Sequence, residues 1–205
     1  MNFNVTLVLK HVALYGVCVF GDKLTDLVQK PALLRACIDN ATHAFIGCLA
    51  AEIFLQCLKY HISRQEYCFL LFVATAVSSL IDLDHFIEAR SFRLQVDATH
   101  LDRRPFLHNS AICVATFVLL MLTKRLERNR SSLFAAAIFI AFSTHHLRDA
   151  TRRGIWIKTP FQDSSSPAVP YVLYLAFVNI IPHVICRLLQ STYSSVPKLR
   201  LVEMV

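Results

Sequence analysis

The sequence has few charged residues for its length. Of its 205 residues, 17% are charged and 55% are hydrophobic, and the mean hydropathy is +0.49. A soluble domain of this size cannot hide so much apolar surface inside one core. The composition therefore argues against an ordinary soluble domain and predicts an integral membrane protein.

Three further absences narrow the class of protein. The seven cysteines have no CxxC spacing, and their odd number argues against a disulfide framework or a zinc knuckle. The sequence has no repeat and no low-complexity tract, so we expect one domain over residues 1–205. The first apolar segment lacks a charged n-region and a clear small-residue cleavage site, which indicates a retained span rather than a signal peptide.

Apolar segments recur along the chain. A helix needs about 20 apolar residues to cross the ~30 Å hydrocarbon layer of a bilayer. The pattern predicts an all-α, multi-pass transmembrane helix bundle of about six spans: Val5–Phe20, Ala36–Leu58, Glu66–Phe86, Leu107–Thr123, Leu133–Leu147 and Ala168–Leu189. The fifth span is short, so we expect it inside a bundle where neighbours shelter its polar end. The later run from Gln162 to Pro167 predicts a flexible turn.

Basic residues outnumber acidic ones, and the formal net charge is +7. The arginines are spread over every predicted loop rather than gathered on one helix, which argues against nucleic acid as a partner. Membrane lipids with anionic headgroups are the partners that such loops favour. Lysine and arginine are more frequent in the loops on the side of Arg103 and Arg148, so the positive-inside rule predicts that this side is cytoplasmic.

Histidine and aspartate residues gather at span ends. Asp39, Asn40 and His43 open the second span, Asp82, Asp84 and His85 close the third, His108 and Asn109 open the fourth, and His145, His146 and Asp149 close the fifth. If the spans alternate in direction, all four groups emerge on the same face. Three pairs at helical spacing each present an imidazole and a carboxylate together: Asp39 with His43, Asp82 with His85, and His145 with Asp149. Such mixed donors suit Zn²⁺, Mn²⁺ or Fe²⁺ better than Ca²⁺ or Mg²⁺.

These residues predict a division of roles around a divalent metal, with Zn or Mn favoured. The candidate metal ligands are His43, Asp82, His85, His108 and His145. Asp84 and Asp149 are the candidate catalytic carboxylates, which accept a proton from water. Asp84 lies about 200° around an ideal helix from Asp82, so one of the two is expected to orient a histidine instead. Arg103 and Arg104 are candidates for substrate binding, because guanidinium groups pair with phosphate or carboxylate oxygens.

Five strings carry a resemblance to known proteins. SLIDLDH (79–85), RRPFLHNS (103–110) and THHLRD (144–149) followed by GIWIKTPF (154–161) resemble the PDxDH, HRGxTHS and SHxxxD…G…PF blocks of the bacterial inner-membrane family named as metal-dependent hydrolases. THAFIG (42–47) is similar to the opening TH…G element of that family. The whole chain is also similar to the animal transmembrane protein 267 family.

The hydrolase-like region covers residues 39–161. The resemblance implies a multi-pass membrane protein with a metal site formed by residues of these blocks: His43, Asp82, Asp84, His85, His108, His145 and Asp149. This chain departs from the hydrolase blocks at three positions. Arg103 replaces the first histidine, Pro105 replaces a glycine and Asn109 replaces a serine, which is compatible with an altered metal site or a pseudoenzyme.

Three function classes use these residues. The favoured class is a metal-dependent hydrolase that acts on a lipid or other amphipathic substrate, for example a phosphoester, at the membrane surface. The alternative is a non-catalytic membrane scaffold in which any metal is structural. An ion- or proton-conducting protein has less support, because Glu52, Asn179 and His183 are the only deep or far-side polar candidates. A metal with an exchangeable water would favour the enzyme over the scaffold.

Overall fold

Helices make up most of the chain that the structure describes. This computed structural model describes residues 4–58, 62–91, 101, 104–127 and 129–193. The elements in chain order are α1 (Val5–Leu27), α2 (Ala32–Cys57), α3 (Arg64–Leu80), the 3₁₀ turn η1 (Ile81–Leu83), α4 (Asp84–Ala89), the 3₁₀ turn η3 (Phe106–His108), α5 (Ala111–Arg125), α6 (Asn129–Arg153), β1 (Trp156–Thr159), β2 (Gln162–Ser165) and α7 (Tyr171–Tyr193). The all-α class is confirmed, with one short β-hairpin added.

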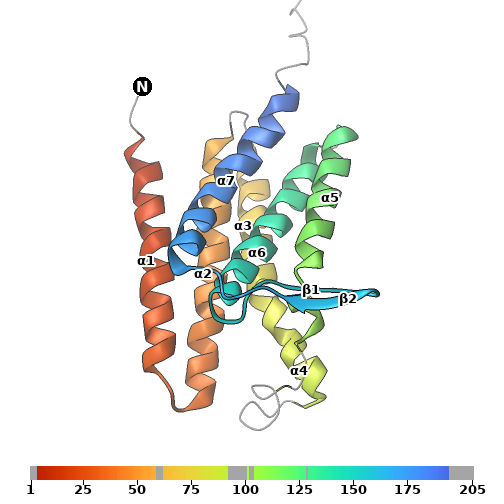
Figure 1. The fold of residues 1–205 in the computed structure, drawn as a ribbon. Helices are drawn as coiled ribbons and strands as arrows, with labels where there is room; N and C mark the ends of the chain where they lie inside the picture. The colour runs from red at the N-terminus through yellow and green to blue at the C-terminus, as the bar shows by residue number, and fades with distance from the viewer. Residues whose placement is uncertain (1–3, 59–61, 92–100, 102–103, 128, 194–205) are drawn as a thin grey trace, which may run out of the picture.

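Helix α6 lies at the centre of the bundle. It contacts α2, α3, α5 and α7, and Figure 1 shows the long helices running side by side. The stretch from Ala135 to Ala141 is largely buried and rich in alanine, and such small side chains let neighbouring backbones approach closely. The apolar core therefore packs around the first half of α6, and the buried polar side chains of α6 lie in its second half.

Four helices in the described part of the chain are long and apolar enough to cross a membrane: Val5–Leu27, Ala32–Cys57, Arg64–Ala89 and Tyr171–Gln190. The prediction of about six spans is not confirmed. Helix α5 has 15 residues and is about 22 Å long, which is shorter than the ~30 Å hydrocarbon layer. Helix α6 has 25 residues, but its second half carries buried histidine and arginine side chains that need protein neighbours rather than lipid.

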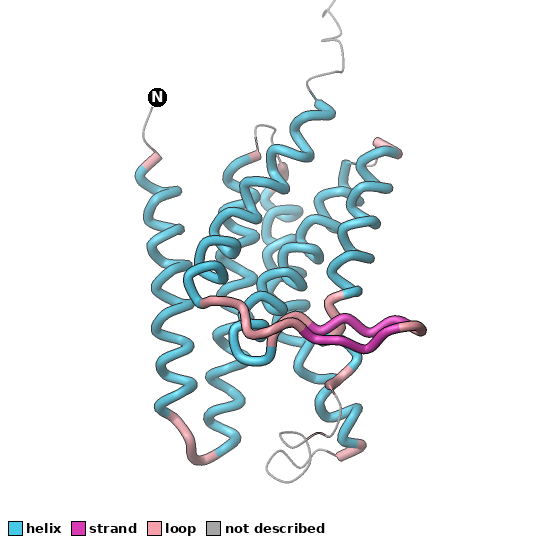
Figure 2. Tube along the Cα trace, in the orientation of Figure 1, coloured by secondary structure: helices cyan, strands magenta, loops and turns pink. Residues whose placement is uncertain are grey.

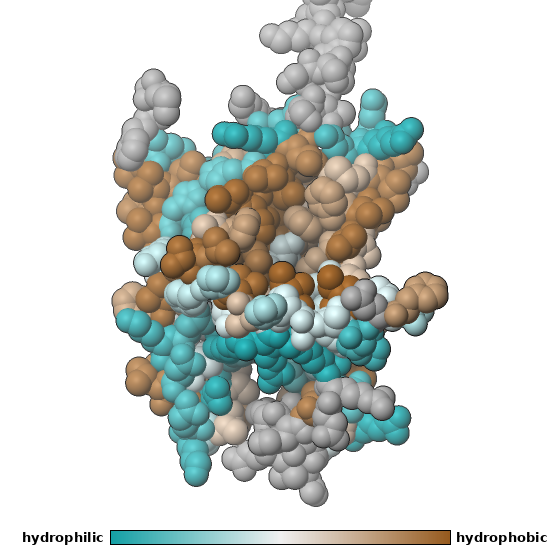
Figure 3. All heavy atoms as spheres, in the orientation of Figure 1, coloured by the Kyte–Doolittle hydropathy of each residue, from teal (hydrophilic) through white to brown (hydrophobic). Residues whose placement is uncertain are grey.

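Apolar side chains cover much of the outside of the helices. Val12 of α1, Phe72 of α3, Val118 of α5 and Val172 of α7 are all exposed. Figure 3 shows a broad apolar region over one part of the visible face and a polar zone beside it. Exposed apolar surface on this scale is unfavourable in water and is covered by lipid in a membrane. The fold is therefore that of an integral membrane protein.

Helices α2 and α3 lie in close contact at Gly47. A Cβ atom added at Gly47 would lie 2.6 Å from Ser78 Cβ and 3.2 Å from the carbonyl oxygen of Ala74. The Ser78 hydroxyl donates a hydrogen bond of 2.9 Å to the carbonyl oxygen of His43. The glycine of the THAFIG string thus allows α3 to pack directly against the turn of α2 that carries His43.

The segment after α6 forms an antiparallel β-hairpin. Trp156 pairs with Ser165 and Thr159 pairs with Gln162, so Pro160 and Phe161 form the turn. The expectation of a flexible turn from Gln162 to Pro167 is therefore wrong for Gln162–Ser165. Gly154 precedes the hairpin at φ +72, where an added Cβ would lie 1.9 Å from the carbonyl oxygen of Ser166. Pairing with β1, which local composition does not reveal, orders the serine-rich strand.

Candidate metal centre

Seven histidine and aspartate residues from separate elements meet at one end of the bundle. The structure brings together all seven residues that the sequence predicted for this site. They come from five elements: His43 from α2, Asp82 from η1, Asp84 and His85 from α4, His108 from η3, and His145 and Asp149 from α6. The expected helical opening at Leu107 is not observed, because α5 begins at Ala111. His108 lies instead in η3, a short turn that packs beside α4.

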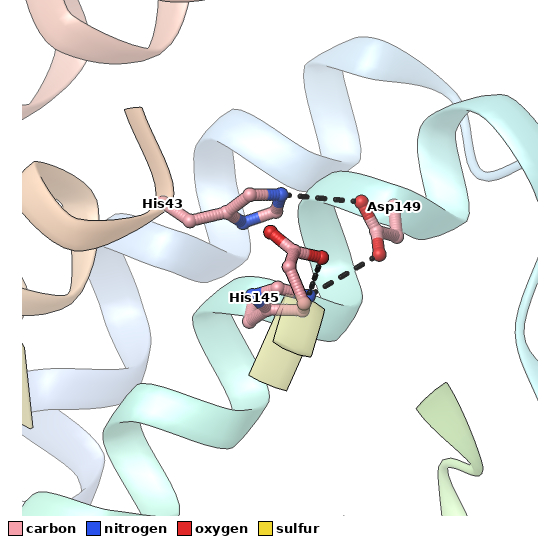
Figure 4. A group of neighbouring side chains, drawn as sticks. His43, His145 and Asp149 are labelled. Carbon is pink, nitrogen blue, oxygen red and sulfur yellow. Dashed lines mark ion pairs between the residues drawn. The ribbon is translucent and has the colours of Figure 1, made fainter. Parts of the chain in front are cut away.

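Asp149 contacts three imidazoles. Its Oδ1 lies 3.3 Å from His43 Nε2, and its Oδ2 lies 3.1 Å from His108 Nε2 and 3.3 Å from His145 Nε2. Figure 4 shows the carboxylate of Asp149 to one side of the His43 and His145 rings, with a dashed line from it to each ring. The sequence assigned Asp149 a proton-accepting role, but its position among the imidazoles favours a role as a metal ligand.

Asp82 is the second shared carboxylate. Its Oδ1 lies 3.3 Å from His108 Nε2 and 3.5 Å from His145 Nε2. The helix α3 ends at Leu80, and the tighter 3₁₀ turn that follows places residues three apart on one side. The potential ligand atoms form two groups, and within each group they lie within 4.8 Å of one another. One group is His43, Asp82, His145 and Asp149, and the other is Asp82, His85 and His108.

His145 has a defined orientation. Its ring is fully buried and stacks on His43 with ring centroids 3.8 Å apart. Because Nδ1 lies 2.9 Å from the carbonyl oxygen of Ser78, Nδ1 carries the proton and donates it to that oxygen. The lone pair of Nε2 therefore faces Asp82 and Asp149, as a metal ligand requires.

The donor groups fit a divalent metal. Both ring nitrogens of the buried His43 lack a hydrogen-bond partner in the described part of the chain, although Nε2 is near Asp149 Oδ1. Nδ1 of His85 also lacks a hydrogen-bond partner there, although it lies 3.3 Å from Asp84 Oδ1. A buried polar atom without a partner is costly, and a cation would satisfy such a nitrogen. The mixture of imidazole and carboxylate suits Zn²⁺ or Mn²⁺.

Asp84 holds the turn that carries His108. Its Oδ2 accepts a hydrogen bond of 2.6 Å from the backbone N–H of Leu107 and lies 3.3 Å from His108 Nδ1. Burial opposes the charged imidazolium of His108, but hydrogen bonds to Asp149, Asp82 and Asp84 raise its pKa to about 11 when no cation shares these carboxylates; a bound metal would replace the proton on Nε2. Asp84 therefore orients His108 so that Nε2 faces the other donors.

We expect the change Asp84→Asn to weaken metal binding by about 10–100-fold, because it removes the anionic partner of His108 while leaving the proposed ligands in place. Equilibrium metal titration of the purified chain with a competing chelator measures this loss. Glu88→Gln on the same helix is the matched control. Equal affinity in Asp84→Asn and the wild type would contradict the orienting role of Asp84.

His146 lies outside the cluster of ligand atoms. Its Nε2 donates a hydrogen bond of 2.8 Å to the carbonyl oxygen of Leu107, and its Nδ1 lies 3.3 Å from Cys113 Sγ. The 100° turn between adjacent helical residues separates it from His145. His146 and Asp84 thus hold η3 at Leu107 from two sides.

A cavity of about 1510 Å³ opens beside the donor groups. Its walls combine metal-binding, basic and apolar residues: Asp82, His85, His108, Asp149, Arg104, Arg152, Leu33, Leu83 and Phe86. The side chains of Asp82 and Asp149 are 23% and 26% exposed, whereas those of His43 and His145 are buried. The carboxylates therefore lie on the cavity side of the cluster, where water and substrate have access.

The structure describes one of the two arginines that the sequence predicted to bind substrate. Arg103 lies outside the described residues. Arg104 lines the cavity, and its guanidinium donates hydrogen bonds to the carbonyl oxygens of Arg153 and Gly154, at 3.3 Å for Gly154. These bonds satisfy carbonyl groups at the end of α6. Arg104 thus fixes the α6 terminus at the edge of the cavity.

The sequence missed a buried ion-pair network beside the cluster. Arg148 is fully buried, with Nε 2.7 Å from Asp22 Oδ1 and Nη2 2.7 Å from Asp39 Oδ1. Arg152 Nη1 lies 3.0 Å from the same Asp39 oxygen. The pairing of Asp39 with His43 expected from helical spacing is therefore wrong, because Asp39 binds arginines of α6. An arginine immediately before Asp149 was the only sequence signal.

The fold and this cluster define a class, a helical integral membrane protein with histidine and aspartate residues gathered at one end of its bundle. Comparison with known proteins gives the family. Transmembrane protein 267 of Xenopus laevis is 34% identical over 84% of this chain and 77% of its own length. The Bos taurus and Danio rerio proteins of that name are each 31% identical, over 82% and 93% of this chain and 75% and 84% of their own lengths. The chain belongs to the transmembrane protein 267 family.

Two other comparisons gave no match. No protein-family profile matches the chain, and no solved structure matches it. The resemblance to bacterial hydrolases therefore rests on the motifs alone.

Proposed function

We propose that this chain is a metal-dependent hydrolase that acts on a lipid or other amphipathic substrate at the membrane surface. The observation that carries the proposal is the convergence of His43, Asp82, His108, His145 and Asp149 beside an open cavity. Separate elements supply these donors, so the cluster is a product of the tertiary fold rather than of one polar helix end. The motif resemblance to bacterial hydrolases favours the same chemistry.

The proposed ligands form two groups that share Asp82, so the site can hold one or two ions. His43, Asp82, His145 and Asp149 form one group, and His85 and His108 complete the other with Asp82. When bound, Zn²⁺ or Mn²⁺ supplies Lewis acidity that lets water attack an ester near neutral pH. Asp84 orients His108 through Nδ1.

The cavity supports an amphipathic substrate. Leu33, Leu83 and Phe86 supply apolar walls, and Arg104 and Arg152 supply positive charge near the carboxylates. Apolar walls favour an acyl chain, and guanidinium groups favour the oxygens of a phosphate or carboxylate. The excess of basic residues in the loops on this side favours a cytoplasmic site.

The ion- or proton-conducting alternative has less support than hydrolysis. At the far end of the bundle, Glu52 pairs with Lys10 at 2.5 Å, and His183 lies 2.8 Å from His11 between Nε2 atoms. Buried apolar side chains lie between this network and the metal donors along α1, α2 and α7: Leu14, Ile46 and Val178. No polar path links the two sets of residues among the interactions of the described chain. The scaffold alternative predicts a metal without exchangeable water, whereas Asp82 and Asp149 lie on the cavity wall.

Lipid turnover tests the proposal directly. The purified chain is stripped with a chelator, reloaded with Zn²⁺ or Mn²⁺ and mixed with vesicles of phosphatidylcholine, phosphatidylserine and phosphatidic acid. We expect metal-dependent release of fatty acid, headgroup or phosphate, because metal and substrate share the cavity. Mass spectrometry of lipids and water-soluble products measures it.

Two variants serve as controls for this assay. His108→Ala removes one proposed ligand and is expected to reduce turnover to the background rate. His183→Gln, at the far end of the bundle, is expected to retain turnover. Turnover no higher in the wild type than in His108→Ala, with either metal, would overturn hydrolysis of these lipids.

A further inference from the structure

The β-hairpin ends in an exposed aromatic residue. Phe161 occupies the turn between β1 and β2, and its side chain is 98% exposed. Figure 2 shows the hairpin projecting sideways from the bundle, across the direction of the long helices. A phenylalanine ring this exposed is not buried against any residue of the part of the chain that the structure describes, so apolar packing within that part does not explain its position.

Polar contacts join the two strands of the hairpin. Lys158 and Asp163 face each other across the strands at 3.8 Å, with side chains 52% and 60% exposed. Trp156 is largely buried, and its Nε1 donates a hydrogen bond of 2.7 Å to Asp163 Oδ1. Charged side chains and open strand edges require water or headgroups around the strands and exclude the hydrocarbon layer. The apolar side chains that the hairpin exposes are Ile157, which is 43% exposed, and Phe161 at the tip, which is almost fully exposed.

The hairpin lies at a boundary of the molecular surface. In Figure 3, apolar surface covers the helices on one side of the hairpin and polar surface lies on the other. The apolar surface is continuous with the helices long enough to cross a membrane. The boundary between the two is the level at which lipid headgroups meet such a protein.

We propose that the hairpin lies in the headgroup region of the bilayer and inserts Phe161 among the upper parts of the acyl chains. The partner is the lipid surface that already surrounds the helices, reached by an arm with an apolar tip. Lys158 is placed to meet anionic lipid headgroups while the tip enters the layer below. This inference does not depend on the proposed hydrolysis.

The hairpin is tied to the candidate metal centre by Asn109. The Asn109 side chain donates a hydrogen bond of 2.8 Å to the carbonyl oxygen of Lys158 and accepts one of 3.1 Å from the backbone N–H of Lys158. The N–H of Ser110 donates a further bond of 2.8 Å to the carbonyl oxygen of Trp156. Because Asn109 directly follows His108, an anchored hairpin sets the depth of the metal donors relative to the headgroups. The asparagine that replaces serine in the hydrolase-like block thereby has a structural role.

Tryptophan fluorescence tests the insertion, because Trp156 is the single tryptophan of the chain. The double variant Trp156→Phe, Phe161→Trp moves it to the tip, and the full chain is placed in phosphatidylcholine vesicles brominated at defined acyl positions. We expect the fluorescence to be quenched most by bromine near the headgroup and little by aqueous iodide. The matched variant Trp156→Phe, Lys158→Trp is expected to show the reverse preference.

Strong quenching by iodide together with no effect of the brominated lipids would overturn the proposal. A second measurement keeps Trp156 and its hydrogen bond. A photoreactive benzoylphenylalanine at position 161 of the otherwise native chain is expected to form adducts of lipid mass on illumination in the same vesicles. Adducts with protein alone, or none, would overturn the proposal as well, whether or not the double tryptophan variant folds.

Discussion

The double variant Asp82→Ala, His145→Ala is expected to purify without the divalent metal that we expect the wild type to carry in near-stoichiometric amount. Asp82 belongs to both donor groups, and His145 directs the lone pair of Nε2 into the first of them. Loss of the two side chains leaves neither group complete. Plasma mass spectrometry of the chain purified in detergent measures bound metal per protein.

Folding and specificity are controlled separately in this experiment. Circular dichroism checks that the double variant retains its helices, and His183→Gln is the histidine variant expected to keep its metal. A metal content of one or two ions per chain distinguishes a single site from two sites that share Asp82. Wild-type protein without metal, after growth with Zn²⁺ and Mn²⁺, would contradict the hydrolase proposal and leave the membrane scaffold.

The change Arg148→Met is expected to lower the free energy of unfolding by about 3–5 kcal/mol, the usual cost of removing one partner from a buried ion pair. The guanidinium is fully buried and binds Asp22 of α1 and Asp39 of α2. Without it, the carboxylates at the junction of the three helices keep only the partly exposed Arg152 as a cationic partner among the described residues. Denaturant titration in detergent, followed by Trp156 fluorescence, measures the difference.

Two further variants separate this effect from a general loss of charge. Arg152→Met removes a partly exposed arginine one turn along the same helix and is expected to cost about 0–1 kcal/mol. The triple variant Arg148→Met, Asp22→Asn, Asp39→Asn removes the charges of all three partners. We expect it to recover much of the lost stability, because replacing a whole buried ion pair is often close to neutral. Equal stability of Arg148→Met and the wild type would contradict a stabilising role for the network.

The sequence predicted the membrane class because composition is a property of the whole chain and requires no contacts. It also predicted the shared location of His43, Asp82, His108 and His145, because helices that alternate in direction return their ends to the same side. The number of spans was harder to predict. Hydropathy in α5 and α6 does not distinguish a lipid-facing helix from one packed against protein, and α6 is central.

Tertiary contacts decided the partners of individual side chains. Helical spacing places Asp39 beside His43, yet Asp39 binds Arg148, which lies 109 residues later in the sequence. Asp84 faces the backbone of η3 for a similar reason, since its partner Leu107 lies 23 residues away. Such pairings depend on how helices dock, and local spacing carries no information about docking.

The sequence by itself determined that this is a helical membrane protein and which residue types gather at one end of its helices. Periodicity and hydropathy are sufficient for that, because each helix obeys them separately. Only the tertiary structure decided which carboxylates face the imidazoles, where the cavity lies and that Asn109 ties a hairpin to His108. The physical reason is that these features arise from contacts between segments far apart in the chain, whose geometry is set by packing of the whole bundle.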